Sequence, residues 1–565
     1  MSVSSGKWSE GHDVIILGAG LAGAVTGLCL ARNGLRVLLI DDRGHPRFAI
    51  GESSTTPASL WLRLLADRFD VPELLSLVTH DSVARDVSAS SGVKNNFGFH
   101  YHREGEPAPS RSWQAVIASA AGADSELHSH PRGGETHYFR QDVDAFMWRA
   151  ALNGGVDGRV GARVENLSFD PDGVRVHLST GEVLSCAFLI DASGIASPVA
   201  RSLNLRDAVP SMRTNSRTMF THMAGVAPYD DVTSVPRTLS PWHQGTLHHF
   251  FDGGWMWVIP FDNHPASTNR LCSVGLNIDN RRFPRETADP EREWSAFLGR
   301  FPSIAAQFEN ALPVRPWVQT ERLQYSSQKC VGDRFWMTTH ATAAVDALYS
   351  FGNINTFQAI AAAVPAILAA FEDRRFEVSR FEPLQRLNDN LFRFHDRVVY
   401  GSYQATRSPD LLATWLALWA LTDTARIREL LIPMIRRVRS GDARELEFYD
   451  RDPANIFTGL GHCTGVEHCS QMLDRLDSWC DIMGELDGGQ ASIESVRERL
   501  DRSVQHESPF GVRLDVMEQS LGQLPWTYAP LSRAGLKGYG SVFLTGEELN
   551  RIGVDREPNR QQSLD

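Results

Sequence analysis

A glycine-rich segment near the N-terminus constrains the fold more than any other feature of the chain. It spans Gly18 to Gly23, directly after the apolar run Val14 to Leu17. A stretch of small residues follows it, and then a second apolar run that ends at Asp41. Apolar runs without polar alternation are typical of parallel strands that are buried on both faces. The order strand, tight turn, helix, strand therefore predicts a doubly wound α/β domain.

The glycine spacing is that of a dinucleotide-binding fingerprint, Gly-x-Gly-x-x-Gly. In such a fingerprint the first glycine permits the turn, the second lets the backbone approach a pyrophosphate, and the third lets the helix pack on the strand. The helix N-terminus faces the anion, and an acidic residue about twenty positions later accepts hydrogen bonds from the ribose. The residues that we expect at this site are Gly18, Gly20, Leu21, Ala22, Gly23 and Asp41.

The residues that follow favour FAD over NAD. The segment with Arg47, Glu52 and Ser53 has the character of one that returns under the cofactor in flavoprotein hydroxylases, and we expect all three near it. The segment Leu189 to Gly194 resembles the second FAD strand of the same proteins, which makes Asp191 a further cofactor residue; the alternative for Asp191 is a plain turn after a strand. No second fingerprint exists for a nicotinamide, so the enzyme either borrows NAD(P)H transiently or receives reduced flavin.

Composition excludes several other classes of protein. With 42% hydrophobic and 22% charged residues the chain is typical of soluble globular proteins, and its net charge of −12 disfavours nucleic acid and anionic lipid. The cysteines are far apart and odd in number, and no signal peptide precedes Asp13, so we expect a cytoplasmic protein. The longest apolar runs, Ile360 to Phe371 and Leu411 to Leu421, are shorter than the roughly 20 residues of a membrane-spanning helix.

The remaining patterns predict two structural units. Val183 to Asp191 reads as a strand, and Gly245 to Asn277 alternates aromatic and β-branched residues as an antiparallel sheet does. From Phe357 onward the pattern is helical. We expect a FAD-binding core with an interleaved sheet over residues 10–395 and a mostly helical C-terminal domain over 396–565. Two His-Cys pairs after residue 460 lack zinc-ligand spacing, so no metal is expected.

The sharpest motif is the heptapeptide Gly-Trp-Met-Trp-Val-Ile-Pro. It resembles the Trp-x-Trp-x-Ile-Pro motif of the flavin-dependent halogenases, and the matching residues are Trp255, Trp257, Ile259 and Pro260. Two tryptophans at strand spacing are by themselves more typical of a sheet core. However, the glycine fingerprint, Gly-Glu-Ser, Phe-Arg-Gln-Asp with Arg140, Thr246 to His249 and Lys94 follow in the family's order. The resemblance is greatest to the branch that acts on free phenols.

The resemblance implies the chemistry. Family members use reduced FAD, O2 and chloride or bromide to make hypohalous acid, which then halogenates an electron-rich aromatic compound. Lys94 lies at the position of the family lysine; a buried lysine with a lowered pKa can hydrogen-bond the hypohalous acid or form a haloamine. Glycine and apolar neighbours favour burial of Lys94, and the alternative is an exposed surface lysine. The implied partners are a small aromatic substrate and a separate flavin reductase, and a second copy of the chain in a homodimer is compatible with this.

A second segment, Asp346 to Gly352, resembles the family's Asp-Pro-Leu-x-Ser-x-Gly turn before a helix over Asn355 to Phe371. The resemblance implies that the backbone N–H groups of Phe351 and Gly352 hold halide, and that Asp346 and Gly352 adjoin the cofactor. The alternative is an ordinary loop-to-helix cap.

The same segment departs from the family at two positions. Ala347 replaces the proline, and Tyr349 stands where indole-acting members have a catalytic glutamate. A phenol supplies its own electron density, so we expect a free phenol as substrate and not tryptophan.

Two other functions remain open from the sequence. One is a single-component aromatic hydroxylase, which Thr339-His340-Ala341 in place of the hydroxylases' Gly-Asp-Ala disfavours. The other is an inactive FAD-binding homologue, which the retained Lys94 and tryptophan motif disfavour. Trp415 and Trp419 are expected in a helical core, with the lid of an aromatic pocket as the alternative.

Overall fold

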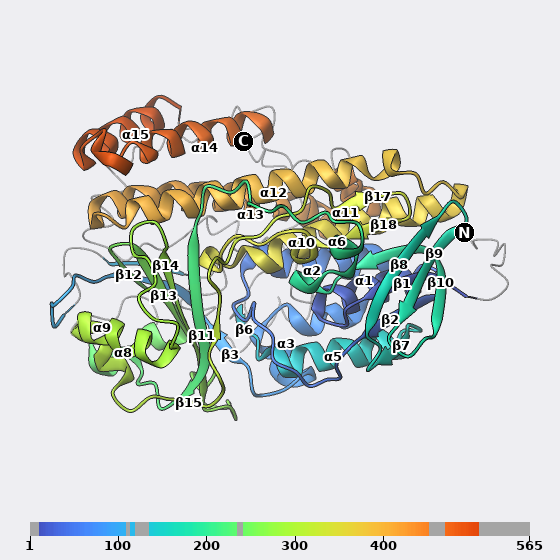
Figure 1. Ribbon diagram of the computed structural model, residues 1–565, viewed down its shortest axis with the longest axis horizontal. Helices are drawn as coiled ribbons and strands as arrows, with labels where there is room; N and C mark the ends of the chain where they lie inside the picture. Colours follow the sequence, from blue (N-terminus) through green and yellow to red (C-terminus); the bar gives the residue numbers. More distant parts are fainter. Residues whose placement is uncertain (1–10, 109–113, 119–134, 234–240, 451–468, 508–565) are drawn as a thin grey trace.

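Two large sheets stand side by side in the computed structural model, and long helices cover both along one edge (Figure 1). The helices are α11 (Phe351–Asp373), α12 (Val378–Ala405) and α13 (Pro409–Ser440). The structure describes residues 11–108, 114–118, 135–233, 241–450 and 469–507.

The first sheet has the strand order β17-β18-β10-β1-β2-β7, with β9 paired to β10 and β8 to β9. Strand β1 runs parallel to both β2 and β10, and every residue from Val14 to Leu17 is buried. This confirms the doubly wound α/β domain. The strands are β1 (His12–Leu17), β2 (Val37–Asp41), β7 (Asp157–Val160), β8 (Val164–Asp170), β9 (Gly173–Leu178), β10 (Val183–Asp191), β17 (Val331–Gly332) and β18 (Phe335–Met337).

The second sheet has the order β15-β11-β14-β13-β12-β4-β5, with β16 paired to β11. All neighbours are antiparallel except β12 and β4, which are parallel. The antiparallel strands expected between Gly245 and Asn277 are confirmed as β12, β13 and β14. The strands are β4 (Asn96–Tyr101), β5 (Gln114–Ala118), β11 (Ser216–Ala224), β12 (Gly245–Phe251), β13 (Gly254–Pro260), β14 (Leu271–Asp279), β15 (Leu312–Pro313) and β16 (Val318–Gln319).

The alternation along β13 separates two hydrophobic cores. Trp255 and Trp257 face the main core, whereas Met256 and Val258 face a smaller core that includes Trp294 of α8 (Pro290–Arg300). Because strand side chains alternate between faces, the motif tryptophans point together toward the first sheet and the long helices.

A third, two-stranded sheet lies between the larger two and carries Lys94. Strand β3 (Gly92–Lys94) pairs antiparallel with β6 (Glu135–His137), and the register sets Lys94 opposite Glu135. A side chain at Gly92 would collide with the carbonyl oxygen of Pro260, 2.4 Å from the ideal Cβ position. Glycine at this position therefore lets β3 pack against the end of β13.

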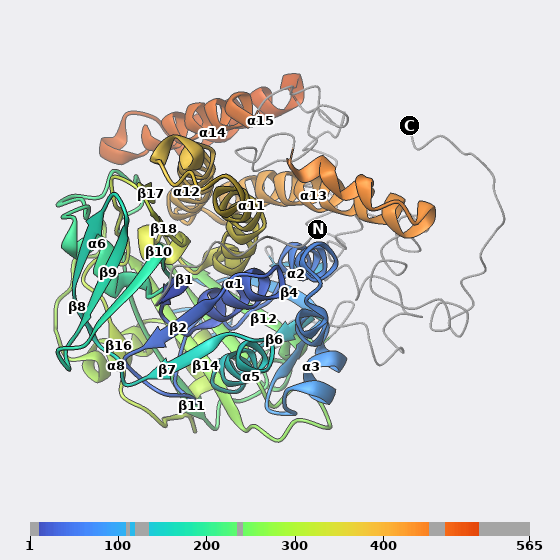
Figure 2. The same ribbon diagram turned by 90° about the vertical axis from the view of Figure 1, so that its right-hand side faces the viewer.

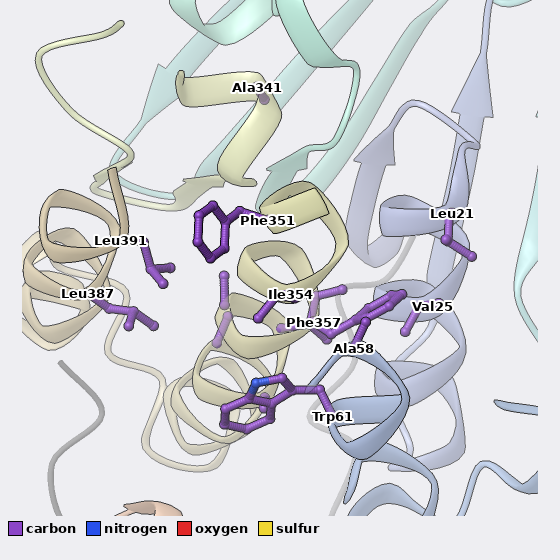
Figure 3. Close-up of a cluster of buried hydrophobic side chains, with 14 of the residues drawn as sticks. Leu21, Val25, Ala58, Trp61, Ala341, Phe351, Ile354, Phe357, Leu387 and Leu391 are labelled. Carbon is purple, nitrogen blue, oxygen red and sulfur yellow. The ribbon is translucent and has the colours of Figure 1, made fainter. Parts of the chain in front are cut away.

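Helix α11 lies at the centre of the molecule. It packs on α1 (Leu21–Arg32) and α2 (Thr56–Phe69) on one side and on α12 on the other. Figure 3 shows Phe351 of its first turn on the side of α12, where Leu387 and Leu391 lie, while Phe357 reaches toward α1 and α2. Figure 2 shows α1 below α11, beside strands β1 and β2.

The apolar stretch that includes this central helix is longer than either of the apolar runs noted in the sequence. Residues Leu348–Asp373 are long and apolar enough to cross a membrane by length and composition, and 72% of the apolar stretch is buried inside the protein. Within the described residues it is the one helix that passes this test. Its burial accounts for its composition, since a core helix that is surrounded by other elements is apolar on all sides.

The C-terminal part is helical, as expected, and it packs on the core. Helix α12 continues without a break across the expected division between residues 395 and 396. Arg393 and Arg397 of α12 both pair with Asp477 of α14 (Cys469–Gly484), and one hydrophobic cluster extends from Val14 to Leu500. The remaining helices are α3 (His80–Asp86), α5 (Arg140–Asn153), α6 (Pro198–Ser202), α7 (Tyr229–Val232), α9 (Pro302–Ala305), α10 (Thr339–Thr342) and α15 (Ile493–Glu507).

Candidate active site

The glycine-rich turn between β1 and α1 has room for a ligand at one glycine and no spare room at the other two. Gly18 has φ +98°, and a Cβ there would lie 2.6 Å from the carbonyl oxygen of Ala192. A Cβ at Gly23 would lie 2.0 Å from the carbonyl oxygen of Gly18. At Gly20 the nearest atoms, side-chain atoms of Arg47 and Asp144, are 3.8 Å away. The protein itself thus requires Gly18 and Gly23, while the space at Gly20 suits the close approach of another molecule.

Helix α1 presents an uncapped N-terminus at this turn. No side chain caps it, and its first turn, which includes Leu21 and Ala22, holds no acidic residue. The unpaired N–H groups and the positive end of the helix dipole favour an anionic group. A dinucleotide pyrophosphate fits this N-terminus.

Asp41 lies at the end of β2 and closes the turn. Its carboxylate accepts hydrogen bonds from the backbone N–H groups of Ala19 at 2.7 Å and Arg43 at 2.9 Å, and it pairs with Arg47. Burial would raise the pKa of Asp41, but the hydrogen bonds from Arg47 and the two N–H groups outweigh it, so the pKa is lowered. Asp41 is therefore a carboxylate at neutral pH, as an acceptor for ribose hydroxyls must be.

Asp191 has a local role in the structure. One carboxylate oxygen accepts from the N–H of Ser193 at 3.0 Å, and the other from the hydroxyl of Ser197 at 2.7 Å and the N–H of Val199 at 3.0 Å. Burial raises its pKa. These bonds fix the turn after β10, and Ala192 of this turn faces Gly18. The contacts of the Asp191 side chain are therefore those of the plain-turn alternative.

Arg140 and helix α11 together hold the segment that contains Glu52 and Ser53. Arg140 donates to the carbonyl oxygens of Ile50 and Gly51, and the side-chain amide of Asn353 on α11 donates to the Gly51 oxygen at 3.2 Å. Glu52 is buried and pairs with the Nε2 atom of His222 on β11 at 2.7 Å. The segment is thereby fixed between the two large sheets, next to the first turn of α11.

His137 connects three of the sequence motifs. Its Nδ1 donates to the carbonyl oxygen of Pro260 at 2.9 Å, so its Nε2, 2.9 Å from the Thr246 hydroxyl, acts as acceptor in the neutral ring. The Thr246 oxygen then accepts from Ser53 at 2.9 Å. Burial, together with the charge of Lys94, lowers the pKa of His137 to about 3 and keeps it neutral. These hydrogen bonds hold the ends of β6, β12 and β13 together around Lys94.

Lys94 is fully buried, which confirms the expected burial. Its ammonium group donates to the carbonyl oxygen of Ser54 and lies 3.5 Å from a carboxylate oxygen of Glu135. It also lies 3.5 Å from the centroid of the Phe97 ring. The other Glu135 oxygen accepts from the hydroxyl of Thr56. No sequence motif indicated Glu135, which lies far beyond Lys94 in the chain and becomes its neighbour only through the β3–β6 pairing.

A group of rings extends from Lys94 to the C-terminal helices; we call it the aromatic cluster. Trp419 of α13 meets Phe97 edge-on at 5.9 Å and stacks on Tyr349 at 4.2 Å. The Tyr349 hydroxyl bonds to the hydroxyl of Ser402 at 2.7 Å. The cluster consists of Phe97, Phe99, His248, Trp255, Tyr349 and Trp419.

Both motif tryptophans are buried against this region. Trp255 lies 5.7 Å from His248 and 5.7 Å from Trp257. Trp257 donates to the hydroxyl of Ser273 at 3.2 Å and occupies the space left by Gly275, where a Cβ would lie 2.0 Å from the indole. The tryptophans form a fixed wall, and Ile259 and Pro260 continue it toward β3.

Helix α11 begins four residues earlier than the sequence predicts, at Phe351. Tyr349 and Ser350, with φ of +66° and +58°, are both left-handed, a conformation that costs about 1–3 kcal/mol for residues other than glycine. No side chain caps α11, and its first turn, with Phe351 and Gly352, has no acidic residue. Asp346 anchors the turn by accepting from Ser216 at 2.9 Å and Tyr403 at 3.0 Å.

His340 lies beside the first turn of α11, whereas the sequence indicated it only as part of a departure from a hydroxylase motif. Its ring lies against Gly352, 3.2 Å from where a Cβ would be. The residue is exposed to solvent, but many protein atoms surround its ring, and this partial desolvation, with the charge of Arg140, lowers its pKa to about 4. A neutral imidazole therefore adjoins the N-terminus of α11. Among the described residues no group of three or more His, Cys, Asp or Glu side chains could hold a metal ion.

We expect the anchor at Asp346 to give stability a measurable pH dependence. Burial raises the pKa of Asp346 to about 6 from an ordinary value of 3.8. The folded state thus binds the proton more tightly, and stability falls by about 2 kcal/mol as pH rises from 4 to 7. Thermal unfolding of the wild type and Asp346→Asn at both pH values measures this, because the substitution removes the titration. An equal difference between the two proteins at both pH values would contradict the prediction.

Comparison with known proteins identifies the family. Residues 13–314 match the family model described as FAD dependent oxidoreductase. The chain is 38% identical to tetracycline 7-halogenase of Kitasatospora aureofaciens over 87% of this chain and 86% of that enzyme. It is 41% identical to monodechloroaminopyrrolnitrin halogenase PrnC of Pseudomonas fluorescens over 82% of this chain and 80% of that enzyme.

A solved structure agrees with these relatives. The crystal structure of halogenase PltM in complex with phloroglucinol and FAD superposes with a TM-score of 0.80 and 31% identity, covering 91% of this chain and 98% of that one. The chain therefore belongs to the FAD-dependent oxidoreductases and, within them, to the flavin-dependent halogenases.

Proposed function

We propose that this halogenase places chlorine or bromine on a small free phenol through hypohalous acid that Lys94 directs, with FADH2 supplied by a separate flavin reductase. The observation that carries the proposal is the convergence of the motifs on one buried lysine. Lys94 lies between the hydrogen-bonded group Ser53, Thr246 and His137 on one side and the aromatic cluster on the other.

FAD is the cofactor of this family, and the residues present fit it. The glycine-rich turn (Gly18, Gly20 and Gly23), with Leu21 and Ala22 at the N-terminus of α1, receives the pyrophosphate, and Asp41 accepts from the ribose. Arg47, Glu52, Ser53, Arg140, Asp191, Asp346 and Gly352 shape the segments around the rest of the cofactor. When bound and reduced, FAD with O2 supplies the oxidation of halide to hypohalous acid.

The N-terminus of α11 is the proposed halide site. Phe351 and Gly352 begin the helix without a side-chain cap, so their N–H groups and the helix dipole favour an anion. His340 lies beside them and is neutral, so its ring adds no charge to the halide site. Phe351 is itself buried against α12, which keeps water from that side of the site.

Lys94 controls the reagent that leaves this site. A buried lysine can hold hypohalous acid by a hydrogen bond or as a haloamine, and either one aims the halogen at a single ring carbon. The aromatic cluster offers flat apolar surfaces for a planar substrate and excludes water that would carry the hypohalous acid away.

The substrate class follows from the residue at position 349. A carboxylate there could assist the removal of a ring proton, worth a factor of about 10² to 10⁴. The Tyr349 hydroxyl cannot replace it, since burial raises its pKa and its oxygen bonds to Ser402. A phenol needs no such help because its own oxygen stabilises the cationic intermediate. Phloroglucinol, with which PltM was crystallised, is such a phenol.

A competition experiment tests the substrate class. The enzyme, FAD, a flavin reductase, NADH and bromide are incubated with equal amounts of a resorcinol-type phenol and tryptophan, and products are quantified by mass spectrometry. We expect the brominated phenol to exceed brominated tryptophan by at least about 10²-fold. Preferential halogenation of tryptophan would contradict the phenol assignment but not the family.

A second experiment tests the single-component hydroxylase. That function would be correct if the purified protein, without a reductase, oxidised NADPH in the presence of the phenol and hydroxylated the phenol.

A further inference from the structure

Glu135 forms a buried ion pair with Lys94 and belongs to none of the sequence motifs. We propose that Glu135 holds Lys94 in its ammonium form at neutral pH, so that Lys94 directs hypohalous acid by donating a hydrogen bond and not by becoming a haloamine. Glu135 is thus a positioning residue that acts through Lys94. The inference rests on the proposed function of Lys94, and it decides between the two modes of action open to a buried lysine.

The pairing is built into the backbone. Lys94 and Glu135 are directly opposite residues in the β3–β6 ladder, so both side chains emerge on the same face. The hydroxyl of Thr56 donates to the second Glu135 oxygen, which leaves the first oxygen toward the lysine at 3.5 Å. A contact made by register and by a third residue does not depend on the flexible lysine side chain finding its own partner.

The surroundings of the Lys94 nitrogen suit a cation. They include a carbonyl oxygen from Ser54, the carboxylate of Glu135 and the face of the Phe97 ring at 3.5 Å. Carbonyl and carboxylate oxygens accept hydrogen bonds, and a ring face attracts positive charge. Because these groups accept hydrogen bonds and do not donate them, they favour the ammonium form, which has three N–H donors, over a neutral amine, which would direct a lone pair at an acceptor.

The other titratable side chains described near the pair carry no charge at neutral pH. His137 of β6 and His248 of β12 face the lysine, and burial, with a further contribution from its charge, lowers the pKa of each to about 3. Burial raises the pKa of Tyr138, which follows β6. All three are neutral near pH 7. Burial also raises the pKa of Glu135, and the charge of Lys94 is the largest of the effects that oppose this rise.

The proposed step balances as ArH + HOX → ArX + H2O. A ring carbon forms the C–X bond with its electron pair while the X–O bond breaks. The departing oxygen takes one proton from the Lys94 ammonium and leaves as water. The proton lost from the ring then returns to the Lys94 amine, which restores the ammonium beside the Glu135 carboxylate. No oxidant beyond hypohalous acid is consumed.

Lysine is rare in this chain, so the charge of Lys94 can be measured directly. The lysines are Lys7, Lys94, Lys329 and Lys537, and lysine labelled with ¹³C at Cε gives a spectrum of few signals, assigned with Lys94→Arg. In flavin-free wild type we expect the Lys94 signal to keep its ammonium position up to about pH 9. In Glu135→Gln the titration midpoint falls by about 2 units or more, as for other buried lysines without a partner. A neutral Lys94 at pH 7 in the wild type, or an unchanged midpoint in Glu135→Gln, overturns the proposal.

A pH profile of phenol bromination supplies the second readout. For Glu135→Gln we expect the alkaline limb to move to lower pH and the yield at pH 7.5 to fall at least about tenfold, while a diffusible hypohalous-acid trap captures more halogen. Glu135→Asp keeps the charge and should restore the profile in part. The matched control is Glu293→Gln, which breaks the ion pair of half-buried Glu293 with the buried Arg217 of β11 and should leave the profile unchanged.

The two readouts separate the inference from the function. If the wild type brominates phenols and the Glu135→Gln profile overlies it, the inference is wrong and the function stands. If the wild type makes no brominated product, the proposed function fails, and the lysine titration still decides the charge of Lys94. Thermal unfolding of each variant shows that it is folded.

Discussion

Lys94→Ala is expected to reduce halogenated product by at least about 10³-fold while the protein still binds FAD and still consumes O2 when given FADH2. The side chain is fully buried, and it contacts Ser54, Glu135 and Phe97, whereas the glycine-rich turn is built from β1 and α1. Removing it should therefore spare the cofactor site and affect only what becomes of hypohalous acid. Product is measured by mass spectrometry, and oxygen consumption with an electrode.

Lys329→Ala is the matched control, because Lys329 is exposed. It should leave the product yield unchanged. In Lys94→Ala, oxygen consumption without product should be accompanied by more halogen captured by a diffusible trap. Near-normal product from Lys94→Ala would show that the lysine does not direct the halogen. Loss of FAD binding as well would show that it is a structural residue.

Alanine at the three fingerprint glycines is expected to separate folding from cofactor binding. Gly23→Ala places a Cβ 2.0 Å from the Gly18 carbonyl oxygen, and Gly18→Ala places one 2.6 Å from that of Ala192, so both should lose FAD binding together with several degrees of Tm. At Gly20 the nearest protein atom is 3.8 Å away. Gly20→Ala should keep its Tm in the absence of FAD and bind FAD at least about tenfold more weakly.

The measurements are thermal unfolding without flavin and a titration with FAD followed by absorbance. Gly299→Ala is the control, since its Cβ would meet no atom within 4 Å and Gly299 lies in α8, away from the turn. Unchanged FAD affinity in Gly20→Ala would mean that the cofactor does not approach the backbone there. A lowered Tm without FAD would mean that the space seen at Gly20 is used by the protein.

The fold was predictable where local pattern and fold agree. The glycine turn, its flanking strands and the alternation in β13 are each encoded within a few residues, and the structure confirms them. The start of α11 was not, since the left-handed pair Tyr349 and Ser350 is held by tertiary contacts and not by local preference. The division at residue 395 likewise has no counterpart in α12, because Arg/Glu-rich helical sequence looks the same on either side of it.

The site was predictable to the extent that it lies in motifs. Family order pointed to Lys94 and the tryptophans, but neither the carboxylate of Glu135 nor the ring of His340 has a spacing that could reveal its neighbour. For Asp191 the sequence correctly predicts the end of a strand. Only the structure shows that its carboxylate oxygens accept hydrogen bonds from the turn that follows. Trp419 was expected in a helical core; its contact with Phe97 depends on where α13 lies relative to β4.

That contact bears on how substrate preference can change during evolution. Lys94 and Phe97 belong to the core, whereas Trp419 belongs to α13, outside the 13–314 region that the general oxidoreductase family model matches. Mutations in α13 can therefore reshape the ring surface above Phe97 without altering the strands that hold the lysine. Under the proposed function, the ring surface that meets the substrate can thus change through α13 while β3 and β6 keep the lysine in place.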